Sequence, residues 1–420
     1  MAHRFHFDAA RLPGMKRWRA LPQHRRSTIL IVFFTVVAIT WPWWRPGSSG
    51  IPLITTFPTI GTGVIMVIYA MMAVGLNIVV GYAGLLDLGY VAFYAMGAYT
   101  VGWLASLQFS QVNFHLWSSA TAGVAGIHVS IWIILLIAGL GTAGVGILIG
   151  LPTLRLRGDY LAIVTLGFGE ILPQVARNGD NLGGFNLTNG PNGITPIDAP
   201  GFPGLSRVTG GVVPNSFLDV TNHDNIYYWA ALVLLAITIF TSLRLRDSRL
   251  GRAWIAIRED ETAAAAMGVP LMRTKTWAYA TGAFFGGVAG AYFASYRSST
   301  FPGDFFFNIS TFILAMVILG GMGNVWGVIV GAFLLAWLNQ EGLANISHSL
   351  NSTLGTHIDG PKYSAGIFGL ILVVTMLVRP EGLIPEARRK AELHEGVHDE
   401  YLYDVEHHDE PLYDDRGVEE

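Results

Sequence analysis

Ionisable side chains inside apolar stretches are the residues best placed for chemistry, because a charge in a membrane is costly and is kept where it serves a function. The chain has three such candidates, Asp87, Glu170 and His128. They lie far apart along the sequence, whereas a proton relay needs a series of neighbouring acids and imidazoles. This spacing weakens the case for ion-coupled transport, and the role of Glu170 as an intramembrane acid stays open.

Before residue 385 the sequence contains no motif of catalysis that would support an enzyme. The chain contains no G-x-x-x-x-G-K-[ST] phosphate-binding loop and no G-x-S-x-G nucleophile turn. It also has no cysteine, which excludes disulfides, thiolate metal ligands and cysteine catalysis. We therefore predict no catalytic residue, no metal site and no cofactor in this chain.

The composition places the chain in a membrane. Of its 420 residues, 52% are hydrophobic, 13% are charged and 50 are glycine, a residue that lets membrane helices approach closely. Several apolar runs reach the roughly 20 residues that cross a bilayer. We predict an all-α polytopic membrane protein with about ten membrane-crossing or half-crossing helices, at residues 28–44, 62–80, 82–106, 127–150, 160–176, 226–243, 276–297, 306–320, 324–340 and 363–378.

Lysine and arginine set the orientation, because they are concentrated in cytoplasmic loops. Basic clusters occur before the first predicted span, after the fourth, after the sixth and after the last, and all fall on one side if both termini are inside. Tryptophan, tyrosine and phenylalanine mark the predicted outer ends, as interfacial anchors do. We predict a multi-pass protein of the bacterial cytoplasmic membrane, N-in and C-in.

These patterns divide the chain into three predicted parts. Residues 1–27 form a basic cytoplasmic extension, 28–384 the transmembrane domain, and 385–420 an acidic tail containing histidines. The tail has the low hydrophobicity of a disordered segment, although its histidines leave a metal site conceivable. Between the fifth and sixth spans, residues 178–225 are rich in Asn, Gly and Pro and are typical of an outer loop with turns.

Glycine interrupts two apolar segments in different halves of the chain. The first runs from Gly75 to Tyr99 and the second from Ile318 to Leu335. Paired interruptions of this kind indicate broken helices beside a transport pathway, but glycine also serves close helix packing, and the sequence leaves both readings open. The candidate pathway residues are Gly81, Gly84, Asp87, Gly89, Gly320, Gly321, Gly323 and Asn324. The charge rule favours a hairpin over one long helix at 306–340.

A charged stretch, residues 251–275, separates two apolar runs. Three acids precede four alanines, then a glycine and a proline, which is typical of a short capped helix. A topology anchor would not need such a helix. We predict that Ile257 to Gly268 form a cytoplasmic coupling helix, with contacts from Ile257, Arg258, Glu259, Asp260, Glu261, Ala263, Ala264 and Gly268.

Four of these stretches together resemble one family. They are GLNIVVGYAGLLDLGYVAFYAMGAY, LRLRGDYLAIVTLGFGEI, GRAWIAIREDETAAAAMGVP and MVILGGMGNVWGVIVGA. In this order they resemble the LivM-type permease subunit of bacterial branched-chain amino acid ABC importers, over about Ile65 to Pro385. The Glu-Ala-Ala to Gly spacing of the wider importer class differs here by one residue, at Glu261 and Gly268.

The resemblance implies partners and a role. It implies a LivH-type permease subunit as heterodimer partner, two ATPase subunits that use ATP and Mg, and an extracytoplasmic substrate-binding protein. It also implies that the 251–275 stretch docks on an ATPase and that the outer loop faces the binding protein, through Gly183, Asn189, Pro191 and Asn192. Nucleic acid is not an expected partner, and the lipid bilayer is.

The substrate and the transporter class have alternatives. A urea or short-chain amide permease of the same superfamily would carry the same motifs. An ion-coupled secondary transporter would need no ATPase but should show paired intramembrane charges, which the sequence lacks. A membrane enzyme is the weakest alternative because the predicted transmembrane domain, residues 28–384, contains no catalytic cluster.

Overall fold

The computed structural model describes residues 36–43, 58–117, 124–156, 158–201, 220–354, 359–379 and 381–384. The chain divides into two compact units, Met1–Ile60 and Gly61–Glu420. The first unit contains a short helix at 36–40 and the 3-10 turn Trp41–Trp43. The predicted span 28–44 therefore lies mostly outside the described residues, as do the basic extension 1–27 and the acidic tail 385–420.

Helices coincide with each predicted span from 62–80 onward, which confirms the all-α membrane fold. They are α3 (Ile60–Asn77), α4 (Val91–Leu104), α5 (Ile131–Thr153), α6 (Asp159–Arg177), α8 (Val220–Asp247), α11 (Leu271–Arg297), α12 (Phe307–Gly320), α13 (Val325–Trp337) and α15 (Ser364–Val378). Six described helical stretches are long and apolar enough to cross a membrane. The predicted span 82–106 is wrong at its start, because α4 begins only at Val91.

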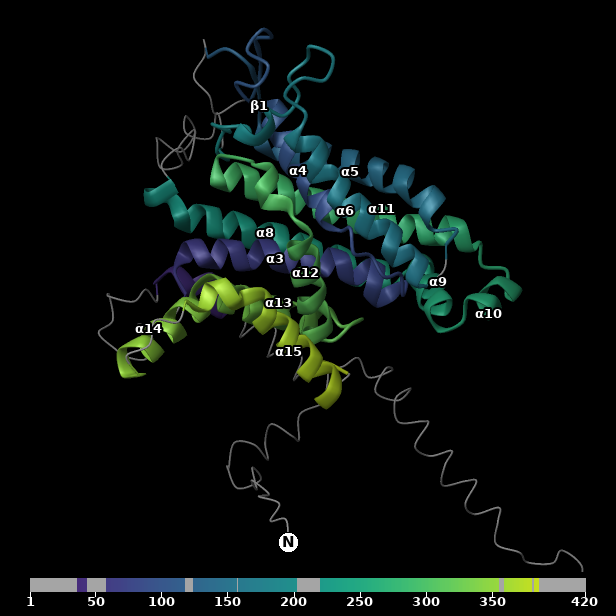
Figure 1. The fold of residues 1–420 in the computed structure, drawn as a ribbon. Coiled ribbons are helices and arrows are strands. Elements are labelled where there is room, and N and C mark those ends of the chain that lie inside the picture. The colour runs from purple at the N-terminus through teal and green to yellow at the C-terminus, as the bar shows by residue number, and fades with distance from the viewer. Residues whose placement is uncertain are drawn as a thin grey trace, which may run out of the picture. The chain divides into compact units, whose positions relative to one another are not determined.

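Helix α11 forms the centre of the second unit and lies side by side with α4 and α5 (Figure 1). Small residues allow this packing. A Cβ at Gly97 of α4 would overlap the Gly287 carbonyl of α11, and a Cβ at Gly290 of α11 would overlap the Tyr94 carbonyl of α4. Backbone therefore meets backbone at these crossings, as small-residue interfaces in membranes allow.

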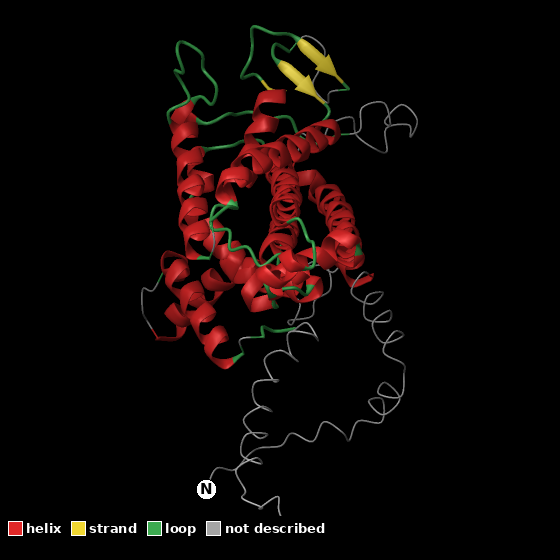
Figure 2. Ribbon diagram, turned by 90° about the vertical axis from the view of Figure 1, so that its right-hand side faces the viewer, coloured by secondary structure: helices red, strands yellow, loops and turns green. Residues whose placement is uncertain are grey.

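A small three-stranded sheet lies at one end of the helices (Figure 2). Its strands are β1 (Ala105–Ser106), β2 (Phe114–Leu116) and β3 (Ile127–Val129), in the order β1-β3-β2. Strand β3 pairs antiparallel with β1 and parallel with β2. The sequence gives no signal for strands this short, and the predicted span 127–150 begins four residues too early, because its first residues form β3.

The chain reverses direction between α12 and α13, which confirms the predicted hairpin. A Cβ at Gly327 would overlap the Gly320 carbonyl, and one at Gly331 would lie 2.7 Å from the Gly320 nitrogen. Beyond α13 a π-helical turn (Leu338–Gly342) leads into α14 (Leu343–Leu354). Helix α14 was not predicted, because its polar residues resemble those of a loop.

The central packing predicts a sharp contrast between two glycines. Gly290→Ala should lower the free energy of unfolding by about 1–3 kcal/mol, because the new methyl group meets the Tyr94 backbone, which cannot move aside. Gly144→Ala on α5 is the matched control, since nothing lies within 4 Å of a Cβ there. Melting temperatures of the purified variants in detergent measure both. Equal melting of the two variants would contradict the close α4–α11 contact.

Candidate functional site

The charged stretch folds into two short helices, α9 (Arg249–Glu259) and α10 (Glu261–Ala266). The Ser248 hydroxyl caps α9 by accepting a hydrogen bond from the Gly251 N–H at 3.2 Å. Trp254 is fully buried, and its Nε1 donates to the Thr274 carbonyl of α11 at 2.8 Å. Helix α9 is therefore fastened to the first turn of α11.

Asp260 separates the two helices. Its backbone is extended, with φ −153 and ψ 111, and its Oδ1 accepts hydrogen bonds from the N–H groups of Thr262 at 2.7 Å and Ala263 at 3.0 Å. The bond from Ala263, followed by those from Thr262, holds the pKa of this carboxyl below its usual range. The predicted single helix from Ile257 to Gly268 is thus wrong, because Asp260 leaves the helix to cap the next one.

The far end of α10 is a small protruding tip. Gly268 has a φ of +84, as a helix-ending glycine requires. Ala263, Ala265 and Ala266 are exposed, whereas Ala264 is buried. Met267 is 85% exposed, although it is a large apolar side chain. The tip therefore offers small alanines and one methionine to a partner.

Glu261 points back toward its own chain. Its Oε1 lies 2.7 Å from the Nζ of Lys275 on α11, and the Lys275 side chain is only 4% exposed. Glu261 is therefore not a free acid in this subunit, and its contact with a partner stays a prediction. Its carboxylate instead neutralises a buried lysine and holds α10 against α11.

Arg258 connects this helical pair to the first glycine-interrupted segment. Its Nη1 donates a hydrogen bond to the Gly81 carbonyl, and its side chain lies over Gly84, where a Cβ would come within 2.8 Å of the Arg258 Cγ. The last turn of α9 thus contacts the interruption between α3 and α4 directly.

The first interruption is a real break in a helix. After α3 the chain makes a π-helical turn (Ile78–Tyr82) and then leaves helical geometry until Val91. Gly84 has a φ of +68, which favours glycine, and a Cβ at Gly89 would overlap the Thr165 carbonyl of α6. Both readings left open by the sequence are therefore present, an unwound segment and a close helix contact.

Asp87 organises this break. It is 1% exposed, and its Oδ1 accepts a hydrogen bond from the Gly89 N–H at 2.9 Å, close to the beginning of α4. Its Oδ2 is buried without a hydrogen-bond partner among the described residues. A carboxylate beside a helix N-terminus is favoured by the helix dipole, which gives Asp87 a structural role here.

The second interruption lies between α12 and α13. Gly321 and Gly323 have φ values of +113 and +92, and Asn324 caps α13 by accepting from the Trp326 N–H at 3.1 Å. The segment 381–384 covers this break. The Leu383 N–H donates to the Leu319 carbonyl at 2.8 Å, and the Ile384 N–H donates to the Gly320 carbonyl at 3.1 Å.

The two interruptions meet at one buried contact. The Gly323 N–H donates to Oδ1 of Asn77 at 2.9 Å, and a Cβ at Gly81 would lie 2.7 Å from the Gly323 nitrogen. Asn77 is completely buried. Arg258, Gly81, Asn77 and Gly323 therefore form a continuous series of contacts from α9 to the second break.

The predicted outer loop is described as far as residue 201. It contains the 3-10 turn Gly190–Asn192, in which Pro191 and Asn192 are exposed, and positive φ values at Gly183 (+66) and Asn189 (+59). Backbone hydrogen bonds between Ile194 and Thr300 fix the loop to the end of α11. The predicted contact residues thus share one loop at the sheet end of the helices.

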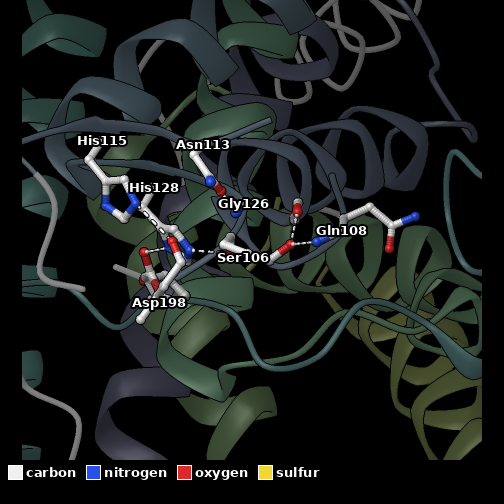
Figure 3. A network of polar contacts seen from close by, with 11 residues as sticks. Ser106, Gln108, Asn113, His115, Gly126, His128 and Asp198 are labelled. Atoms are coloured by element: carbon white, nitrogen blue, oxygen red, sulfur yellow. Dashed lines mark hydrogen bonds and ion pairs between the residues drawn. The ribbon is translucent and has the colours of Figure 1, made fainter. Parts of the chain in front are cut away.

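A polar network secures this loop to the sheet (Figure 3). The Nδ1 of His128 lies 2.7 Å from Oδ2 of Asp198, and the His115 ring stacks on His128 with 5.1 Å between centroids. Burial raises the pKa of the Asp198 carboxyl above its usual range, and the contact with His128 opposes that shift. His128 was predicted within a span, but it lies on β3, before α5 begins.

Two remaining predictions concern acids and metal. Glu170 lies on α6 with its side chain exposed. In the part of the chain that the structure describes, no group of three or more His, Asp or Glu side chains is arranged to hold a metal ion. The acidic tail, which also contains the H-E-x-x-H pattern His394–His398, lies outside that part.

Sequence reasoning missed Asn77, Trp254 and Lys275, which hold the site together. Two of the three carried a weak signal. Asn77 is a polar residue in an apolar run, and Lys275 begins an apolar helix in which a charge needs a partner. Neither signal identifies the partner, because Asn77 and Gly323 are 246 residues apart.

Interrupted apolar helices beside a protruding helical tip are typical of multi-pass membrane transport proteins, and this chain is therefore of that class. The comparisons with known proteins give the family. The chain belongs to the branched-chain amino acid transport system / permease component family, whose model matches residues 59–376.

Named relatives agree with this family. The chain is 36% identical to the high-affinity branched-chain amino acid transport system permease protein LivM of Escherichia coli K12, over 89% of this chain and 78% of that protein. It is 26% identical to a probable LivM permease of Methanocaldococcus jannaschii, over 76% of this chain and 91% of that protein. It is 25% identical to the high-affinity branched-chain amino acid transport system permease protein LivH of E. coli K12, over 76% of this chain and 93% of that protein. No match to a solved structure was found.

The buried ion pair predicts a non-additive pair of substitutions. Glu261→Gln should lower the melting temperature, because it leaves the Lys275 ammonium buried without its carboxylate. Adding Lys275→Met should recover much of that loss, since the unpaired charge is then gone. The melting temperature of Lys275→Met alone is measured as well. If the decrease in melting temperature of the double variant equals the sum of the decreases of the two single variants, the two residues are not coupled.

Proposed function

We propose that this chain is a membrane-spanning permease subunit of an ATP-driven importer and moves branched-chain amino acids, leucine, isoleucine or valine, into the cell. Family membership and the relatives named LivM support this substrate class. The observation that carries the mechanism is the series of contacts from α10 and α9 through Arg258 to both helix breaks.

The partners follow from the resemblance to the importer family. It implies two separate ATPase subunits that use ATP and Mg, and the lack of a phosphate-binding loop in this sequence is consistent with that division. A LivH-type permease completes the transmembrane part, and an extracytoplasmic binding protein delivers substrate to the 178–201 loop. The similarity to a LivH protein supports a pair of related permease subunits.

In this mechanism α10 transmits the movement of an ATPase subunit. The exposed alanines and Met267 dock on the ATPase, and the ion pair to Lys275 and the Trp254 hydrogen bond make α9, α10 and the start of α11 move together. Arg258 carries the displacement to Gly81, and Asn77 carries it to Gly323. The ATPase must contact the tip differently in its two states, because equal contacts would shift no equilibrium.

The function is tested with the complete importer, co-expressed with its partner subunits. Uptake of labelled leucine, isoleucine and valine should depend on ATP hydrolysis, while urea and acetamide should not be taken up. Uptake of urea but not leucine would replace the proposed substrate class by the short-chain amide alternative.

A substitution at the tip tests the docking surface. Met267→Asp should reduce uptake at least about tenfold and release the ATPase during purification, because it places a charge in an apolar contact. Met267→Leu is the control, since it keeps the apolar volume. Parental uptake by Met267→Asp with the ATPase still bound would show that α10 does not dock there.

The orientation is tested by cysteine labelling, since the chain has no cysteine of its own. The exposed residues Asn192 and Ala265 lie on opposite sides of the membrane in the N-in, C-in arrangement of the cytoplasmic membrane. A membrane-impermeant thiol reagent should label Asn192→Cys in intact cells and Ala265→Cys only after lysis. Labelling of Ala265→Cys in intact cells would reverse the proposed topology.

A further inference from the structure

The exposed surface of α6 is divided into a polar side and an apolar side. At 3.6 residues per turn, Gly167, Glu170 and Gln174 recur at intervals of three and four and lie along one line of the helix. Beside this line lie Ile171 and Val175, which are 55% and 49% exposed. A helix surrounded only by lipid would show the apolar side alone.

Glu170 cannot face lipid at low cost. Its side chain is exposed, and no described residue of this chain forms a hydrogen bond or ion pair with it. Helix α6 was predicted to span the membrane, although it is not among the six described stretches that are long and apolar enough to cross one. If α6 spans the membrane, Glu170, the twelfth of its 19 residues, lies too far from either end for a short side chain to reach the interface. Its surroundings in the assembled protein must therefore be water or polar groups.

The polar line leads from the outer loop into the helix. Arg177, at the end of α6, lies against the Phe306 ring, and the loop that begins at Asn178 is the proposed contact of the binding protein. In the opposite direction from Glu170 the exposed side chains become apolar, with Ile163 66% and Tyr160 72% exposed. The line is polar only in the half that adjoins the outer loop.

Space is available beside Glu170. A Cβ placed at Gly167 would have nothing within 4 Å, so the surface one turn away carries no side chain and meets no neighbour in this subunit. A carboxylate accepts hydrogen bonds and donates none, and it pairs best with a cation. The α-ammonium group of an amino acid has this chemistry.

We propose that Gly167, Glu170 and Gln174 line the water-filled outer half of the transport pathway, and that the Glu170 carboxylate accepts hydrogen bonds from the α-ammonium group of the passing amino acid. This role rests on the proposed function as an amino acid permease, and it assigns to Glu170 a direct contact with substrate. Ile171 and Val175 face lipid or packed protein.

Cysteine labelling tests the water-facing line. In cells that express the complete importer, a charged thiol reagent should label Gly167→Cys and Gln174→Cys, because water reaches them. The matched controls Ile171→Cys and Val175→Cys lie on the same helix at similar depths and should stay unlabelled. Labelling of all four variants, or of neither pathway variant, would overturn the proposed line.

Leucine uptake tests the contact with substrate. Glu170→Gln should reduce uptake about tenfold or more, because the amide oxygen still accepts a hydrogen bond but carries no charge to pair with the ammonium group, whereas Glu170→Asp should retain most of the uptake. The amount of assembled complex and the affinity of the binding protein for leucine should be unchanged in both. Parental uptake by Glu170→Gln, or equal loss in both variants, would overturn the ammonium contact.

The two tests separate this inference from the proposed function. If the parental complex takes up no branched-chain amino acid, the proposed function fails, and the labelling pattern alone decides whether α6 faces water. If the parental complex transports leucine but Glu170→Gln does so equally well, the ammonium contact fails and the proposed function stands.

Discussion

Backbone groups without partners are too costly to leave inside a membrane, and this constraint governs the whole site. Two apolar segments of this chain abandon helical geometry at buried positions, so the freed N–H and carbonyl groups need partners from elsewhere in the protein. The Asn77 side chain supplies one for Gly323, Arg258 supplies one for Gly81, and the segment 381–384 supplies two for the end of α12. Each break is therefore held by residues distant in sequence, and a change at one is felt at the other.

The packing is close along the route by which the proposed mechanism transmits movement. Helices α4 and α11 approach until backbone touches backbone, and α5 packs on α11 through the side chains of Thr142, Phe284 and Ala283. The pair α9 and α10 is joined to the same α11 by an indole hydrogen bond and a buried ion pair. In the proposed mechanism, a force on the protruding tip would therefore pass to the helices instead of being lost in a loose loop.

The sequence predicted the parts of this protein that depend on local pattern. Apolar runs located the helices, glycine clusters located both breaks, and the alanine stretch with Gly268 located the end of α10. What depends on distant contacts was not predictable. A single sequence does not show that Asn77 meets Gly323 or that Glu261 turns to Lys275, because nothing local fixes the partner of a polar side chain. Asp260 misled the analysis for a local reason, since an acid suits both a first helical turn and the capping position before it.

The segment 381–384 has a consequence for how the protein is made. The last carbonyls of α12, at Leu319 and Gly320, receive their hydrogen bonds from Leu383 and Ile384, more than sixty residues further along the chain. A ribosome has synthesised α13, α14 and α15 before these donors exist. During membrane insertion the α12–α13 hairpin is therefore left with an unfinished end. The arrival of residues 383 and 384 closes it, so the second break is completed only after α15 has been made.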